Sequence, residues 1–226
     1  MRRIFARTSN VDKFIAAMDR LHQRSYGIPG MALVYGNPGL GRTHTVLWWY
    51  SQNNGIYVPA KRYMSPRWLL QEIVSELGAS PSPRVADLFL QCKDLLMENP
   101  KTIIIDEIDY LIHDAKVEVL RDIHDTTGTP IVMVGMEMAD KKLMRFKHLF
   151  DRISEIVKFS DLTEQDIKMI IDQICEVKLS ADAIQFIYSL TNRFRRLVIW
   201  IYRVEAFAKT NGLKEISAAH LREIVG

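Results

Sequence analysis

Apolar and polar residues follow one another along the chain in blocks that predict alternating strands and helices. Short apolar runs predict strands, and longer stretches with apolar residues three or four positions apart predict amphipathic helices. The predicted strands are 31–35, 56–58, 101–106, 131–134 and 155–159, and the predicted helices before residue 160 are about 10–24, 41–53, 66–77, 85–97, 117–126 and 139–148. Strands that alternate with helices in this way form an α/β fold, a parallel sheet with helices on both faces.

The pattern changes after Phe159, where only helical periodicity remains. Helices are expected at about 164–175, 180–190, 194–210 and 217–225, with no further strand. Thr163 and Asp166 have the spacing of a capping box at the start of the first of these helices. Earlier in the chain, Ser9 or Asn10 is the expected N-cap of the first helix. The sequence therefore predicts an α/β domain over 1–160 and a small all-α domain over 161–226.

Composition narrows the class of protein. Of the 226 residues, 48% are hydrophobic and 25% charged, which is typical of a globular protein. The net charge is only +3, so contact with nucleic acid would need a local basic patch. Cys92 and Cys175 lack metal-ligand spacing and are expected to be reduced thiols. We find no signal peptide and no membrane span in the sequence and expect a cytoplasmic protein of a bacterium or a phage-infected host.

A glycine-rich turn follows the first predicted strand, and its spacing is that of the phosphate-binding loop G-x-x-x-x-G-K-[ST]. The loop and the start of its helix comprise Gly36, Asn37, Pro38, Gly39, Leu40, Gly41, Arg42, Thr43 and His44. Its glycines allow the backbone N–H groups to surround an anion, and the helix adds the positive end of its dipole. The Thr43 hydroxyl is placed to bind Mg²⁺ between phosphates. The alternative is a Gly-Pro turn that binds no ligand.

Arg42 departs from this motif, which has lysine at that position. Arginine carries the same charge and contacts phosphate well, but its side chain is longer, planar and forked. We therefore expect nucleotide binding to be retained and hydrolysis to be slow.

A second segment, Lys101–Glu107, contains three consecutive isoleucines and then two carboxylates. The isoleucines fit a strand buried on both faces of a parallel sheet. Asp106 is expected to join the Mg²⁺ shell, and Glu107 to polarise the attacking water. The alternative is a buried strand followed by a helix-capping aspartate, but the preceding phosphate loop favours the nucleotide site.

With both motifs placed, nearly the whole chain resembles the AAA+ ATPases, which have a nucleotide-binding α/β domain followed by a helical lid. This resemblance implies ATP and Mg²⁺ as ligands. It implies that Arg152, in the segment Phe150–Ile153, is an arginine finger for the neighbouring subunit, with Arg145 as the second choice. It also implies that Arg195, in Asn192–Leu197, is the sensor-2 arginine. The polar sensor-1 residue is missing, since the fourth strand leads into Gly135-Met136-Glu137.

Within AAA+, the chain is similar to DNA-transposition regulators of the phage Mu B and TnsC type. Three segments carry this similarity, Thr8–Val11, Gly128–Met136 and Leu149–Ile153. The similarity implies ATP-dependent, non-specific binding to double-stranded DNA, self-association into a ring or helical filament, and recruitment or activation of a transposase at target DNA.

The candidate DNA contacts are Lys61, Arg62 and Arg67, which lie next to Tyr63 and Trp68. A second basic patch consists of Lys141, Lys142, Arg145 and Lys147. Two other functions stay open. The chain could be a nucleotide-gated assembly switch that hardly hydrolyses ATP, or an AAA+ ATPase of secretion or signalling without a DNA partner.

Overall fold

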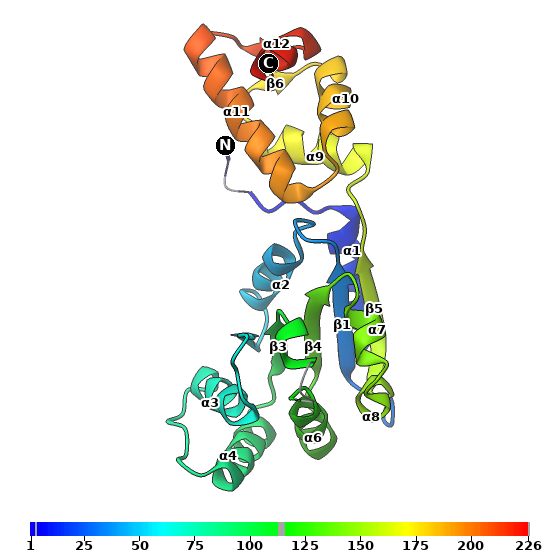
Figure 1. Ribbon diagram of the computed structural model, residues 1–226, viewed down its shortest axis with the longest axis vertical. Coiled ribbons are helices and arrows are strands. Elements are labelled where there is room, and N and C mark those ends of the chain that lie inside the picture. Colours follow the sequence, from blue (N-terminus) through cyan, green and yellow to red (C-terminus); the bar gives the residue numbers. More distant parts are fainter. Residues whose placement is uncertain (3, 113–115, 226) are drawn as a thin grey trace. The chain divides into compact units, whose positions relative to one another are not determined.

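A computed structural model describes residues 1–2, 4–112 and 116–225 (Figure 1). The elements in chain order are α1 (Ser9–His22), β1 (Met31–Gly36), α2 (Arg42–Tyr50), β2 (Gly55–Pro59), α3 (Pro66–Glu76), α4 (Val85–Glu98), β3 (Thr102–Asp106), α5 (Asp109–Ile112), α6 (Glu118–Thr127), β4 (Ile131–Met136), α7 (Ala139–Leu143), α8 (Lys147–Phe150), β5 (Ile153–Phe159), α9 (Glu164–Ile174), β6 (Lys178–Leu179), α10 (Ala181–Leu190), α11 (Phe194–Asn211), β7 (Glu215–Ile216) and α12 (Ala218–Val225). Among the described residues, no helix is long and apolar enough to cross a membrane.

The chain divides into two compact units. The sheet unit contains Lys13–Gly36 and Arg42–Phe159, and the helical unit contains Met1–Asp12, Asn37–Gly41 and Ser160–Gly226. The longest segment of the helical unit begins at Ser160, directly after β5. The first twelve residues and the loop 37–41 cluster with the helical unit, which the sequence does not indicate.

The sheet unit is built on five parallel strands in the order β2-β3-β4-β1-β5. All five predicted strands are present. Every residue of β1 and β3 is buried, because these inner strands are covered on both faces. The predicted α/β class is therefore confirmed. Parallel order also places the ends of β1 and β3, which carry the two motifs, at the same edge of the sheet.

The helices of the sheet unit follow the predicted pattern with two differences. Ser65 caps α3, since its side chain accepts a hydrogen bond from the Trp68 N–H, and α3 and α4 pack side by side (Figure 1). The single helix expected at 139–148 is wrong, because α7 ends at Leu143 and α8 begins at Lys147. The short helix α5 was not predicted.

The helical unit has its own apolar core, which includes Ile170, Ile187, Leu197 and Ile201. The predicted capping box of α9 is confirmed, with Thr163 and Asp166 each bonded to the other's backbone N–H. The prediction of no strand after Phe159 is wrong, because β6 and β7 pair in parallel over two residues each. Such a short pair leaves no alternating pattern in the sequence.

The N-cap expected for α1 is also wrong. Thr8 holds that position, and its hydroxyl accepts the Val11 N–H at 3.4 Å. Ser9 instead donates from its backbone and its hydroxyl to Asp166, at 2.7 and 2.8 Å. Asn10 exchanges two hydrogen bonds with the backbone of Ser160. Both side chains therefore fix the start of α1 within the helical unit.

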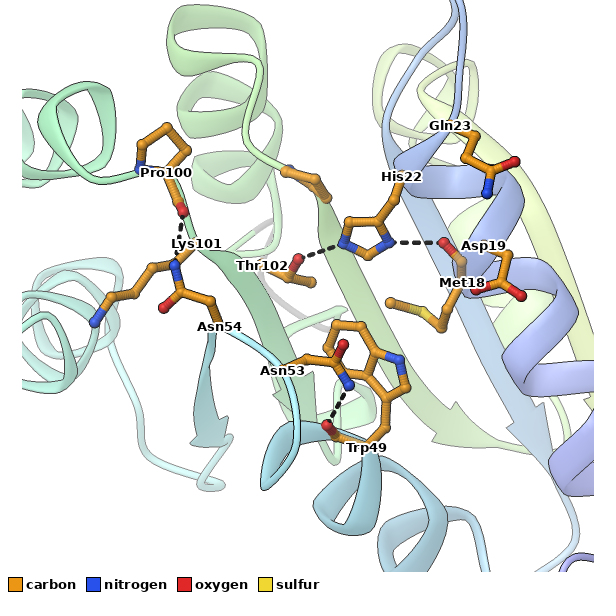
Figure 2. A pocket seen from close by; sticks show the side chains of 11 residues that line it. Met18, Asp19, His22, Gln23, Trp49, Asn53, Asn54, Pro100, Lys101 and Thr102 are labelled. Carbon is orange, nitrogen blue, oxygen red and sulfur yellow. Dashed lines mark hydrogen bonds between the residues drawn. The ribbon is translucent and has the colours of Figure 1, made fainter.

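A cavity of about 420 Å³ lies at the amino edge of the sheet, lined by the ends of α1 and α2 and the starts of β3 and β4 (Figure 2). The His22 ring bridges the Met18 carbonyl and the Thr102 hydroxyl, at 2.7 and 2.8 Å, and lies 5.5 Å from the Trp49 ring. Since both ring nitrogens are occupied, His22 holds α1 to β3. This cavity lies at the opposite end of the strands from Gly36 and Asp106, the last residues of β1 and β3.

Candidate nucleotide-binding site

The loop that follows β1 has the backbone of an anion-binding turn. Gly39 and Gly41 have φ angles of +83° and +91°, which side chains other than glycine rarely adopt. Within the helical unit, the Arg195 N–H donates to the Gly39 carbonyl at 3.0 Å, and the Arg193 guanidinium donates to the Pro38 carbonyl at 3.4 Å. The structure thus brings the predicted phosphate loop together with the predicted sensor-2 segment at the start of α11.

Arg42 is the first residue of α2, and its guanidinium is partly buried in the sheet unit. Burial lowers the pKa of Arg42, while the negative charges of Asp106, Glu107 and Asp109 act in the opposite direction. Its Nη1 atom is buried and has no hydrogen-bond partner in the described part of the chain. A buried cationic donor without an acceptor is costly, so this atom fits an anionic ligand oxygen.

The next two residues of α2, Thr43 and His44, are exposed in its first turn. The Thr43 hydroxyl is therefore accessible for a ligand.

Asp106 ends β3 as a buried carboxylate with two fixed hydrogen bonds. Its Oδ2 accepts the Tyr57 hydroxyl at 2.8 Å, and its Oδ1 accepts the Glu107 N–H at 2.8 Å. Burial, the charge of Asp106 and this hydrogen bond raise the pKa of Tyr57. The Tyr57 hydroxyl therefore stays protonated and donating at neutral pH. Sequence reasoning missed Tyr57, because its contact with Asp106 follows from the pairing of β2 with β3.

Glu107 adopts a left-handed backbone with φ of +54°, and it is the one non-glycine residue with positive φ among those described. This conformation costs about 1–3 kcal/mol for a side chain of this kind. Strain of this kind is common at functional sites, where it sets the direction of a side chain.

The end of β4 explains the missing sensor-1 side chain. A Cβ at Gly135 would lie 2.6 Å from the Ala139 Cβ and 2.8 Å from an Ile108 methyl group, so no side chain fits. Asp109 occupies this region instead. It accepts the Met136 N–H at 2.6 Å and the Lys142 ammonium at 2.7 Å. The sequence pattern does not indicate this role of Asp109, although Asp109 lies only three residues after Asp106.

Arg152 lies directly before β5, at the amino edge of the sheet. The phosphate loop follows β1, the parallel neighbour of β5, and a six-residue strand separates the two edges by about 20 Å. Arg152 donates to Asp125 of α6 through two nitrogens. Arg145, the second choice, is exposed. Within the sheet unit, Arg152 therefore lies at the opposite edge from Gly36, where β1 ends.

The predicted DNA contacts lie after β2 and at the start of α3, and all are exposed. The Lys61 ammonium lies 4.9 Å from the Trp68 ring centroid and 3.4 Å from Glu72, and the Arg67 guanidinium donates to the Pro83 carbonyl at 2.8 Å. Arg62 lies over Tyr63, which is also exposed. In the second patch, Lys142 is engaged with Asp109, so that patch presents one cation fewer.

The residues fit the implied ligands in chemistry. A hydroxyl from Thr43 and a carboxylate from Asp106 are the oxygen donors that Mg²⁺ prefers. Each Asp106 oxygen accepts one hydrogen bond and so keeps further capacity as an acceptor. The unpaired Arg42 Nη1 and the loop N–H groups fit phosphate oxygens.

Comparisons with known proteins agree with these motifs. The AAA domain family matches residues 27–143. The chain is 27% identical over 151 residues to the ATP-dependent target DNA activator B of Escherichia phage D108, covering 63% of this chain and 48% of that protein. It is 26% identical over 151 residues to the protein of the same description from Escherichia phage Mu, with the same coverage. The chain therefore spans about half the length of these relatives.

Solved structures share the fold of this chain. Cdc6p of Pyrobaculum aerophilum superposes with a TM-score of 0.68 at 18% identity, covering 99% of this chain and 67% of that chain. At this identity the likeness concerns the fold alone. The AAA domain match covers just over half of the chain. This protein therefore belongs to the AAA+ family of P-loop ATPases, and within it is related to the phage target DNA activators.

Proposed function

We propose that this protein is an ATPase that binds double-stranded DNA non-specifically as an ATP-dependent oligomer, selects target DNA and activates a transposase. The observation that carries the proposal is the similarity to the two phage target DNA activators over 151 residues. The chain also carries the glycine-rich loop after β1 and the acidic pair Asp106-Glu107 at the end of β3. In this proposal, residues 1–160 form the nucleotide-binding domain and residues 161–226 form the helical lid.

ATP binding is assigned to the loop 36–44. The backbone N–H groups of the loop and the start of α2 surround the phosphates, and Arg42 supplies a cation with an unpaired donor. Thr43 and Asp106 hold Mg²⁺, which when bound neutralises charge on the phosphate oxygens. Tyr57 keeps the Asp106 carboxylate in place for this role.

Hydrolysis is assigned to Glu107, Arg152 and Arg195. Glu107 orients and polarises the attacking water, and its strained backbone fixes the carboxylate direction. Arg195 belongs to the segment that contacts the loop within the helical unit. Arg152 acts on the neighbouring subunit, because it lies at the sheet edge opposite the end of β1 in its own subunit. Such a head-to-tail contact closes as a ring or continues as a filament.

DNA binding is assigned to Lys61, Arg62 and Arg67. All three are exposed, and Lys61 and Arg62 lie over the rings of Trp68 and Tyr63. A few phosphate contacts per subunit, repeated along an assembly, suffice for non-specific binding that weakens steeply with salt.

Electron microscopy of the purified protein with duplex DNA tests the proposal. Samples contain ATP, a slowly hydrolysed analogue, or no nucleotide. We expect filaments or rings on DNA only when nucleotide is present. Particles that ignore DNA in every nucleotide state would contradict the DNA role and favour an AAA+ ATPase of secretion or signalling.

A second candidate function is a nucleotide-gated assembly switch that hardly hydrolyses ATP. Two observations favour it, Arg42 in place of the motif lysine and the lack of space for a side chain at Gly135. It predicts nucleotide-dependent assembly with almost no phosphate release. Steady release of phosphate that DNA stimulates would exclude it.

A further inference from the structure

Two helices carry exposed stripes of opposite charge with the same spacing. On α4 the stripe is Asp87, Leu90 and Asp94, and on α11 it is Arg196, Ile199 and Arg203. In both stripes, the apolar residue lies three positions after the first charged residue, and the second charged residue lies seven positions after the first. Residues at i, i+3 and i+7 lie on one face of a helix, so each stripe is continuous.

The α4 stripe borders a hollow of about 420 Å³. The residues around this hollow are Asp87, Leu90, Gln91, Asp94, Leu95 and Glu98. Leu90 is 51% exposed, which is high for a leucine in the middle of a helix. Three carboxylates around an apolar floor exclude DNA and favour a cationic partner with an apolar side chain.

The α11 stripe has the complementary character. Ile199 is 41% exposed and Tyr202, beside it, is 67% exposed. The Arg203 guanidinium lies 5.7 Å from the Trp200 ring centroid, which holds it on the helix surface.

The charges of both stripes are largely available. Asp87, Arg196 and Arg203 form no ion pair with any described residue. Asp94 contacts the neighbouring Lys93 at 3.6 Å. A partner could therefore pair with these charges without first breaking strong interactions.

We propose that the α11 stripe of one copy packs on the α4 stripe of a second copy. The partner is assigned as a second copy of this chain, because the chain carries both stripes and their residues have the same spacing. In the contact, the two arginines of one copy pair with the two aspartates of the other, and Ile199 packs on Leu90. The contact joins different surfaces on the two copies, which is a heterologous interface that propagates head to tail. This proposed contact rests on the self-association in the proposed function, and it specifies which surfaces associate.

Charge reversal with mixing tests the contact. One variant carries Arg196→Glu and Arg203→Glu, and the other carries Asp87→Lys and Asp94→Lys. Sedimentation velocity with ATP and without DNA measures self-association. Each variant alone opposes like charges and should associate about tenfold more weakly or worse, whereas their equimolar mixture should recover association, because each then offers the other an opposite charge. A mixture that stays as weak as its components would overturn the contact.

The matched control is the variant Lys168→Glu with Lys214→Glu, which makes the same charge change at exposed positions outside α11. It should associate like the unaltered chain. An equal loss in this control would assign the effect to net charge and overturn the contact. An unaltered chain that stays monomeric at every concentration would also overturn it.

A cysteine pair gives a readout that does not depend on charge. Leu90→Cys and Ile199→Cys, made in separate chains, should form an intermolecular disulfide on mild oxidation only when mixed. Cys92 and Cys175 are both buried and serve as the background in each variant. Equal cross-linking in unmixed samples would contradict the assigned pairing.

DNA binding is measured in parallel by co-sedimentation of the same variants with duplex DNA and ATP. Association through the two stripes without DNA binding would keep the contact and reject the proposed function. ATP-dependent DNA binding with association unchanged by charge reversal would keep the function and reject the contact.

Discussion

Arg152 donates two hydrogen bonds to Asp125, from Nε to Oδ1 at 2.9 Å and from Nη2 to Oδ2 at 3.0 Å. Asp125 lies on α6 and Arg152 at the start of β5, so the pair joins two elements of the sheet unit. A guanidinium has five N–H donors, and this pair uses two of them. The remaining three keep a fixed direction while Asp125 holds the group.

Removing this carboxylate should affect stability in a pH-dependent way. Hydrogen bonding to Arg152 lowers the pKa of Asp125 below its ordinary value of 3.8. A lowered pKa in the folded state stabilises the fold above the ordinary value, and this contribution is lost as pH falls through the folded-state pKa. Because both side chains are more than a third exposed, Asp125→Asn should cost at most about 1 kcal/mol at pH 7.

Urea unfolding across a pH series measures this effect. The unfolding free energies of the unaltered chain and Asp125→Asn should converge as the pH falls below 3.8. The control Asp172→Asn, at an exposed position, should have the same unfolding free energy as the unaltered chain at every pH. If the difference in unfolding free energy between the unaltered chain and Asp125→Asn were the same at every pH, the contribution of Asp125 would not depend on its charge.

Arg152→Ala should lower the ATP turnover number at least about tenfold, since an arginine finger stabilises charge in the transition state. Arg145→Ala is the matched control and should retain turnover. Phosphate release is measured for each variant.

Mixing decides whether Arg152 acts on a neighbouring subunit. Arg152→Ala and Glu107→Gln should each be inactive alone, yet a mixture should regain part of the turnover. In the mixture, an intact Glu107 in one subunit can meet an intact Arg152 from another. No recovery would indicate that both residues serve the same subunit.

Arg42→Lys should raise the ATP turnover number several-fold, because lysine is a compact charge that places the phosphates differently from a forked guanidinium. If position 42 limits the reaction, the increase should be about tenfold or more. ATP affinity should change less than turnover. Titration with a fluorescent ATP analogue and a phosphate-release assay separate the two quantities. Unchanged turnover would show that the side chain at position 42 does not limit the reaction.

Tyr57→Phe should destabilise the sheet unit by about 1–3 kcal/mol, because a buried carboxylate loses a hydrogen-bond donor. Tyr50→Phe is a suitable control, since the Tyr50 ring centroid lies 6.1 Å from that of Tyr57. Chemical unfolding measures both variants. Both changes remove a hydroxyl and keep the ring, so equal losses in the two would mean that the cost does not come from the bond between Tyr57 and Asp106.

The sequence predicts the strands well because buried parallel strands appear as uninterrupted apolar runs, as in Ile103–Ile105. It also predicts the glycine turn after β1 and the position of Asp106 and Glu107 at the end of β3, because both follow from local sequence patterns. It does not predict contacts that arise from strand order and register. Tyr57 reaches Asp106 only because β2 pairs with β3, and Asp109 reaches the Met136 N–H only because β3 pairs with β4.

The cap of α1 shows a different limit. Ser9 and Asn10 are good capping residues by type, but their polar atoms bond to Asp166 and Ser160, more than a hundred residues later in the chain. Local propensity cannot indicate such a long-range competitor. The strands β6 and β7 could not be predicted for the same reason, because they form by pairing with each other across a long stretch of sequence.

The left-handed backbone of Glu107 has a consequence for engineering. Glycine or asparagine would relieve the strain at this position, by about 1 kcal/mol or more. A selection of variants for heat resistance alone would therefore favour replacements that discard the carboxylate. Thermostable descendants of this chain would be expected to accumulate change at position 107 and to lose turnover as they gain stability, unless the selection also demands activity.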